Sequence, residues 1–179
     1  MPTPESLIRY FSFPQNKSDW LNSEIKKLGS GSNLAIHVRM GDYLNFPLLY
    51  DTVDLSYYLN SIREYQSRQS SFSVTLFSDS PTKAIDFLDS KIKIDNIQYS
   101  DWSVSSAETF ELLSNFDGII AANSTFSWWA GYLGTLNGTC DFVSLPSHFL
   151  RDIPINDKLG FARAHIISAC SNLKFRTGC

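Results

Sequence analysis

The residues best suited to chemistry follow an apolar run, Leu34–Val38, of the kind that forms a buried strand. His37 lies within that run, and Arg39, Gly41 and Asp42 come after it. A guanidinium can bind a phosphate through two N–H bonds, and an imidazole beside it adds another donor. The stretch therefore predicts an anion-binding site. A core histidine and a solvated arginine at a loop end would give the same pattern, so this stretch alone leaves both interpretations open.

A second polar stretch, Asn123–Thr125, also follows an apolar run and comes just before a predicted helix. The first amides of a helix have no acceptor within it, and the helix dipole favours negative charge there, so such a helix start can bind an anion. Ser124 and Thr125 would add hydroxyl donors. An ordinary N-cap is the alternative, because Asn, Ser and Thr are all preferred in that position. We expect Trp128 and Trp129 to pack against the sheet.

A third polar stretch, which contains Asp79, follows the apolar run Phe72–Phe77. A carboxylate at this position could accept two N–H bonds from a guanine edge or bind ribose hydroxyls. It could equally cap the helix predicted behind Pro81. Glu108, in a later helix, could line the same crevice, although most helical glutamates face solvent.

Runs of strand length alternate with segments of helical length along most of the chain. The predicted strands are 34–38, 72–77, 94–99, 118–121 and 141–145, and the predicted helices are 19–28, 54–67, 82–88, 106–115 and 126–136. This alternation predicts an α/β fold, a Rossmann-like parallel sheet with helices on both faces. Ligands bind at the carboxyl ends of such strands, which is where all three polar stretches lie.

The chain divides at a Gly/Ser-rich stretch, Gly29–Ser32. We expect residues 1–33 to be a lead-in and residues 34–179 to form one nucleotide-binding domain. Beyond about residue 157 the pattern weakens. There we expect a docking tail that is helical from Phe161.

Composition limits the classes of function. The hydrophobic fraction of 43% supports a packed core, and a net charge of −3 excludes a broad basic face for nucleic acid. Any phosphate site must therefore be local. No apolar run is long enough for a membrane span, the N-terminus lacks signal-peptide features, and Cys140, Cys170 and Cys179 have no metal-binding spacing. We expect a cytoplasmic chain.

Three stretches in order, His37–Tyr43, Phe77–Asp79 and Ile120–Trp129, carry a family resemblance. Together they resemble the α-1,2-fucosyltransferases of glycosyltransferase family 11, over about residues 34–150. The resemblance implies a GT-B enzyme with two Rossmann-like lobes, of which this chain would be the donor-binding half and residues 1–33 a remnant of the acceptor lobe. It also implies GDP-fucose as donor, inversion at the sugar carbon, and no metal or other cofactor.

The resemblance also implies roles for single residues. Arg39 would hold the β-phosphate and neutralise charge on the GDP leaving group, and His37 would lie against the nucleotide. Asp79 would contact guanine or ribose, and the diphosphate would contact the helix start, at Ser124, Thr125 and Phe126. Met40 stands where the family often has a second arginine, and Ser80 where a second aspartate is frequent.

A catalytic base is harder to assign. Asp42 is the carboxylate nearest to Arg39 in the sequence, and it could deprotonate the acceptor or brace Arg39 and the turn. The base could also lie on another lobe, or be dispensable because GDP leaves readily.

Two functions are therefore open. The first is inverting transfer of L-fucose from GDP-fucose to a galactose hydroxyl of a glycan acceptor, destined for a surface polysaccharide. The second is a GDP-sugar-binding module, or an inactive fragment, without the acceptor lobe. A Rossmann-like domain for another nucleotide is disfavoured, since the chain has no G-x-G-x-x-G or Walker pattern. The expected partners are the donor and the acceptor, with no nucleic acid and with peripheral membrane association as an option. A eukaryotic fragment would imply the Golgi lumen.

Overall fold

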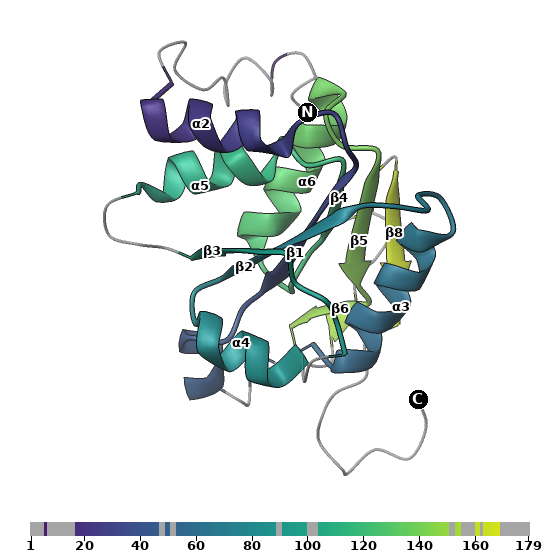
Figure 1. Cartoon of the computed structure of the whole chain (residues 1–179). Helices are drawn as coiled ribbons and strands as arrows, with labels where there is room; N and C mark the ends of the chain where they lie inside the picture. Colours follow the sequence, from purple (N-terminus) through teal and green to yellow (C-terminus); the bar gives the residue numbers. More distant parts are fainter. Residues whose placement is uncertain are drawn as a thin grey trace.

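The structure is a computed structural model that describes residues 6, 17–46, 49–50, 53–88, 91–99, 104–150, 153–154, 160–161 and 163–168. Its centre is a parallel sheet in the order β3-β2-β1-β4-β5-β8 (Figure 1). These strands are β1 (Asn33–Val38), β2 (Ser73–Ser78), β3 (Asn96–Tyr99), β4 (Gly118–Ile120), β5 (Phe142–Pro146) and β8 (Ala164–Ile167). A short antiparallel pair, β6 (His148–Leu150) and β7 (Ile153–Pro154), lies outside it.

Helices cover both faces of the sheet. They are α2 (Asp19–Leu28), α3 (Leu55–Gln66), α4 (Pro81–Leu88), α5 (Ser106–Leu113) and α6 (Thr125–Asn137), with a 3-10 helix η1 (Asp42–Asn45). Figure 1 shows α2, α5 and α6 on one side and α3 and α4 on the other. Since side chains alternate along a strand, Leu34 and Ile36 of β1 join the core under α3 and α4, whereas Ala35 joins the core under α5 and α6.

The fold class predicted from the sequence is confirmed. The five predicted strands and the five predicted helices up to residue 145 are all present, and each end lies within two residues of its expected position. In the part of the chain that the structure describes, no helix combines the length and apolar character that crossing a membrane requires.

The helix expected from Phe161 is wrong. Residues 164–167 form β8, which runs parallel to β5 with Val143 opposite Ala164 and Pro146 opposite Ile167. The reason is that β5 would otherwise expose its unpaired backbone at the edge of the sheet.

The N-terminal lead-in contributes a helix to the same core. Ser18 caps α2 by accepting from the Leu21 N–H, and Leu21 is buried with the residues of α5 and β4. The proposed division of the chain at residue 33 stays a prediction.

The order of the strands creates a switch point beside β1. The chain runs outward from β1 through β2 to β3, then returns to place β4 on the other side of β1. Ligand sites of open α/β sheets lie at such a reversal, outside the carboxyl ends of the strands. The loops after β1 and β4, which carry Arg39 and Ser124, both start there.

Candidate functional site

A cavity of about 190 Å³ lies at the carboxyl ends of β1 and β2, on the face covered by α5 and α6. Its wall comes from both strands, from the residues after them and from the two helices: His37, Arg39, Phe77, Ser78, Asp79, Ser106, Thr109 and Phe126. Four of the site residues predicted from the sequence are therefore in one cavity wall: His37, Arg39, Asp79 and Phe126.

Asp79 organises the loop after β1. Its Oδ2 lies 3.2 Å from Arg39 Nε and accepts from the Gly41 N–H at 2.9 Å, while Oδ1 accepts from the Met40 N–H at 3.0 Å. The Arg39 guanidinium also lies over the Tyr43 ring, with its carbon 5.5 Å from the ring centroid. The guanidinium is thus held from two sides at the cavity wall.

This arrangement explains the glycine in the motif. A Cβ on Gly41 would overlap Asp79 Oδ2, so only glycine lets the backbone approach the carboxylate this closely. A carboxylate that braces Arg39 thus comes from the residue directly after β2, and the bracing role considered for Asp42 stays a prediction. Asp42 begins η1, and its side chain lies outside the described part of the structure. The contact of Asp79 with guanine or ribose stays a prediction.

His37 is buried in the cavity wall at 5% exposure, and its Nδ1 has no hydrogen-bond partner. Its ring lies 5.7 Å from that of Phe126, centroid to centroid. Burial lowers the pKa of His37 to about 4, with Asp79 raising it and Arg39 lowering it further. The imidazole is neutral at pH 7. A buried nitrogen without a partner is costly, and a ligand in this cavity is one means of satisfying it.

The start of α6 is a capped helix N-terminus. Ser124 Oγ accepts from the Phe126 N–H at 3.3 Å, so the N-cap alternative is present. A cap of this kind satisfies one backbone N–H. The other N–H groups of the first turn have no acceptor within the helix and point out of its N-terminal end. Thr125, the first residue of the helix, is exposed. An anion could therefore still be bound at this helix start.

One hydrogen bond joins the two polar loops. Tyr43, from the loop after β1, donates through its hydroxyl to the Asn123 carbonyl at 3.2 Å. The Asn123 amide in turn donates to the Phe149 carbonyl at 3.2 Å. Ser124 and Thr125 follow directly, so the residues predicted to bind the diphosphate begin beside the Arg39 loop.

Sequence reasoning considered Glu108 of α5 as a crevice residue but missed Ser106 and Thr109 of the same helix. Ser106 and Thr109 line the cavity, whereas Glu108 caps the helix, its Oε2 accepting from the Ser105 N–H at 3.1 Å and from Ser105 Oγ at 2.7 Å. The helix was predicted from residue 106, and the S-x-x-E spacing of its capping box supports that start. Residues three apart on the same face would then have pointed to Ser106 and Thr109.

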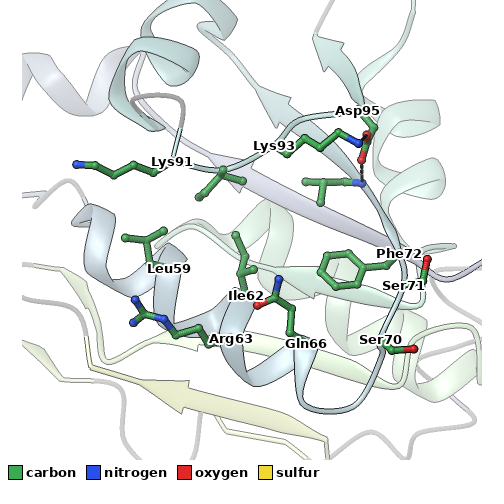
Figure 2. Close-up of a pocket in the computed structure, with 12 residues that line it drawn as sticks. Leu59, Ile62, Arg63, Gln66, Ser70, Ser71, Phe72, Lys91, Lys93 and Asp95 are labelled. Atoms are coloured by element: carbon green, nitrogen blue, oxygen red, sulfur yellow. Dashed lines mark hydrogen bonds and ion pairs between the residues drawn. The ribbon is translucent and has the colours of Figure 1, made fainter.

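A larger cavity of about 610 Å³ lies at the opposite, amino end of the strands (Figure 2). Figure 2 shows Arg63, Lys91 and Lys93 around an apolar floor that includes Ile62 and Phe72. None of the predicted site residues lines it. We assign the functional site to the smaller cavity because it lies at the switch point. Among the described residues, no group of three His, Cys, Asp or Glu side chains could hold a metal ion.

Comparisons with known proteins show the family of the chain. The family model described as "Glycosyl transferase family 11" matches residues 14–147. The O-antigen biosynthesis glycosyltransferase WbnK of Escherichia coli is 28% identical over 109 residues, which cover 59% of this chain and 36% of WbnK. The matched part is thus about a third of that relative. Among solved structures, the E. coli ADP-heptose lps heptosyltransferase II has a TM-score of 0.47 and 11% identity, covering 87% of this chain and 47% of its own. Because the family model spans most of its length, this chain belongs to glycosyl transferase family 11.

Proposed function

We propose that the chain binds GDP-fucose in this crevice and transfers L-fucose to a galactose hydroxyl of a glycan acceptor. Membership of family 11 supports a glycosyl transfer role. The observation that carries the proposal is the position of Arg39: Asp79 holds it at the cavity wall, in a loop that Tyr43 bonds to the residue before Ser124. A guanidinium and a helix start at one crevice suit a diphosphate.

The size of the cavity suggests how the donor is divided. Its volume of about 190 Å³ is below the roughly 300–1,000 Å³ of pockets that enclose a whole ligand. We therefore place one part of the donor in it, the guanine or the adjoining ribose, with neutral His37 beside it. The diphosphate would then lie across the mouth, between Arg39 and the start of α6. Donor positioning would correspond to that of the nucleotide-sugar lobe of a GT-B enzyme.

The proposed reaction is a direct displacement. The acceptor oxygen forms a bond to the anomeric carbon as the bond to the β-phosphate oxygen breaks, through an oxocarbenium-like state with inversion. Negative charge grows on the departing GDP, where Arg39 and the α6 dipole would stabilise it without a metal. Because Asp79 already braces Arg39, Asp42 is our candidate for the base that takes the acceptor proton.

The relative suggests the class of acceptor. WbnK is described as an enzyme of O-antigen biosynthesis. We propose by extension that the acceptor here is a galactose-terminated oligosaccharide of a surface polysaccharide, and that the chain acts in the cytoplasm or at the membrane periphery.

A direct assay tests the proposal. The purified chain is incubated with GDP-fucose and lactose, and GDP release and fucosylated product are measured. Arg39→Ala should lower turnover by about a hundredfold or more, as removal of a group that stabilises developing charge does. Arg63→Ala is the matched control, since Arg63 lines the cavity at the other end of the strands. Equal turnover in the wild type and in Arg39→Ala would refute the role given to Arg39.

The same assay separates the second candidate. The second candidate is a module that binds the GDP-sugar without transferring it; the region matched to WbnK spans 36% of that protein. Binding of GDP-fucose by titration calorimetry with no product would support that module. No binding of GDP-fucose at all would refute both functions.

A further inference from the structure

Two adjacent tyrosines on α3 hold the strand ends that carry the site. Tyr58 donates through its hydroxyl to the His37 carbonyl of β1 at 3.1 Å. The single hydroxyl proton of Tyr57 is shared between the Ala121 carbonyl, just after β4, at 2.7 Å and the Ser144 carbonyl of β5 at 2.9 Å. Both tyrosines are almost fully buried, and their rings meet edge to face at 5.0 Å between centroids. One helical turn thus contacts three strands.

These bonds occur where β1 stops pairing with β4, although β1 stays paired with β2 as far as Val38 opposite Ser78. The ladder between β1 and β4 ends with Ile36 opposite Ile120. The His37 and Ala121 carbonyls come directly after these last paired residues. A buried carbonyl beyond a ladder needs another donor, and the two phenols supply it from the face opposite the cavity. The tyrosines therefore bind the two strands at the point where the crevice opens.

A hydroxyl network fixes Tyr57 in turn. Ser61 Oγ donates to the Tyr57 carbonyl at 2.8 Å and lies 2.7 Å from Ser144 Oγ, which donates to the Tyr57 hydroxyl at 3.2 Å. All three side chains are completely buried. Buried polar networks of this kind, once satisfied, specify a unique arrangement of the elements that they join.

The two carbonyls that Tyr58 and Tyr57 bind, those of His37 and Ala121, lie within a few residues of the site. His37 lines the cavity and Arg39 lies two residues beyond the carbonyl that Tyr58 holds. Ala121 precedes the turn in which the Ser124 N–H donates to the Ala122 carbonyl at 2.8 Å, and α6 starts from this turn. A shift of either carbonyl would move the guanidinium or the helix start.

We propose that Tyr57 and Tyr58 are positioning residues for donor binding, which set the separation between the Arg39 loop and the start of α6. This inference rests on the proposed function, because it names residues that shape the same site. The two hydroxyls do not touch the cavity. They act on the donor through the backbone of β1 and β4.

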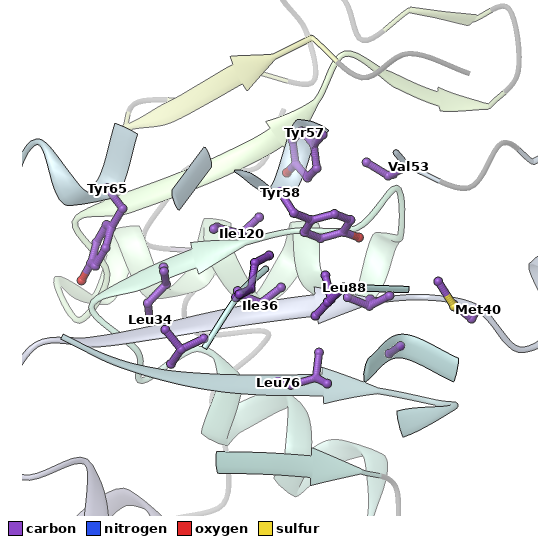
Figure 3. Close-up of a cluster of buried hydrophobic side chains, with 14 of the residues drawn as sticks. Leu34, Ile36, Met40, Val53, Tyr57, Tyr58, Tyr65, Leu76, Leu88 and Ile120 are labelled. Atoms are coloured by element: carbon purple, nitrogen blue, oxygen red, sulfur yellow. The ribbon is translucent and has the colours of Figure 1, made fainter. Parts of the chain in front are cut away.

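The test uses three single tyrosine-to-phenylalanine variants, each of which removes one buried hydroxyl. Figure 3 shows Tyr57 and Tyr58 toward the tip of β1 and Tyr65 near its start. Tyr65, on the same helix, is 2% exposed, and its hydroxyl lies 2.7 Å from Ser32 Oγ. Tyr65→Phe is therefore the matched control. The measurements are the melting temperature, the Kd for GDP-fucose, and hydrogen exchange of the amides in 37–41 and 121–125.

We expect all three variants to lower the melting temperature by similar amounts. Tyr57→Phe and Tyr58→Phe should also raise the Kd for GDP-fucose by about fivefold or more, and each should speed exchange in the segment that its hydroxyl holds. Tyr65→Phe should leave the Kd unchanged. If Tyr57→Phe does not fold, Tyr58→Phe decides the matter alone. A Kd in both site variants equal to that of Tyr65→Phe would overturn the inference.

Failure of the proposed function gives a different result. In that case the wild type itself would not bind GDP-fucose. Hydrogen exchange then decides the positioning role: faster exchange only in Tyr57→Phe and Tyr58→Phe supports it, and unchanged exchange in all three variants overturns it.

Discussion

At the scale of single residues, the pair of Arg39 and Asp79 serves orientation more than stability. The two side chains are 32% and 21% exposed, and partly solvated pairs of this kind contribute roughly 0–1 kcal/mol. The hydrogen bonds from the Met40 and Gly41 amides give the same carboxylate a fixed place. The guanidinium is consequently held in position before a ligand arrives, and this lowers the entropic cost of binding one.

The Asp79→Asn variant tests whether Asp79 orients the Arg39 guanidinium, as distinct from supporting the fold. The variant keeps an oxygen for one backbone amide but loses the charge beside Arg39, so we expect the Kd for GDP-fucose to rise about tenfold, equivalent to about 1.4 kcal/mol. Asp95→Asn is a matched control, since Asp95 also accepts from a backbone amide, that of Val74 at 2.9 Å, and pairs with Lys93 at 3.0 Å. A similar loss of affinity in both variants would contradict the orienting role of Asp79.

His37 should make the protein less stable in mild acid. Its pKa is about 4 in the folded state and 6.5 in the unfolded chain. The unfolded chain therefore binds the proton more readily, and stability present above pH 6.5 is lost as the pH falls toward 4. The full shift corresponds to about 3 kcal/mol.

Urea unfolding at pH 7 and pH 4.5 checks this expectation. The wild type should lose more free energy of unfolding between the two pH values than His37→Gln does. Burial also lowers the pKa of His165, but both proteins contain that residue, so their difference isolates His37. Identical losses in the two proteins would show that the His37 ring titrates normally.

At the scale of elements, β8 completes the sheet although it lies beyond the region that matches the family model, which ends at residue 147. The Ser147 N–H donates to the Ile167 carbonyl at 3.0 Å, and the Val143 N–H donates to the Arg163 carbonyl at 3.3 Å. All residues of β5 are buried. β8 therefore protects the backbone of a fully buried strand.

Truncation before β8 should cause aggregation. A chain that ends at Leu150 leaves β5 as an unpaired, apolar edge, which is a template for pairing with another chain. A chain that ends at Ser168 keeps β8 and is the control. Size-exclusion chromatography at equal concentration should show high-mass species for the first and a profile like that of the full chain for the second. A monomeric first chain would mean that β5 needs no cover.

An element could be predicted from the sequence where its own residues determine it, and could not where a distant part of the chain determines it. Strands such as 34–38 and 118–121 were predictable because they are buried on both faces and read as continuous apolar runs. The segment 164–167 was not, since four residues show no period and only the open edge of β5 makes them a strand. The bracing role of Asp79 was also beyond the sequence, because it depends on β2 lying directly beside β1.

At the scale of the whole molecule, connectivity makes the site. The chain places β2 and β4 on opposite sides of β1. The carboxyl end of the sheet therefore receives the Arg39 guanidinium from the loop after β1 and the start of α6 from the loop after β4. Tyr43 and Asn123, 80 positions apart, are then joined by a hydrogen bond from the Tyr43 hydroxyl to the Asn123 carbonyl. The location of the crevice is a property of strand order, and the residues only determine what it binds.

The ion pair of Arg39 and Asp79 in the cavity wall also affects which anions the site binds. Of the described residues in its wall, Arg39 and Asp79 are the charged ones, and His37 adds no charge at neutral pH. The charges of these two side chains offset each other, in a chain of net charge −3. Such a site exerts little long-range attraction on phosphate, sulfate or acidic metabolites. We therefore expect a small anion without further contacts to compete only weakly with a larger ligand for the Arg39 guanidinium.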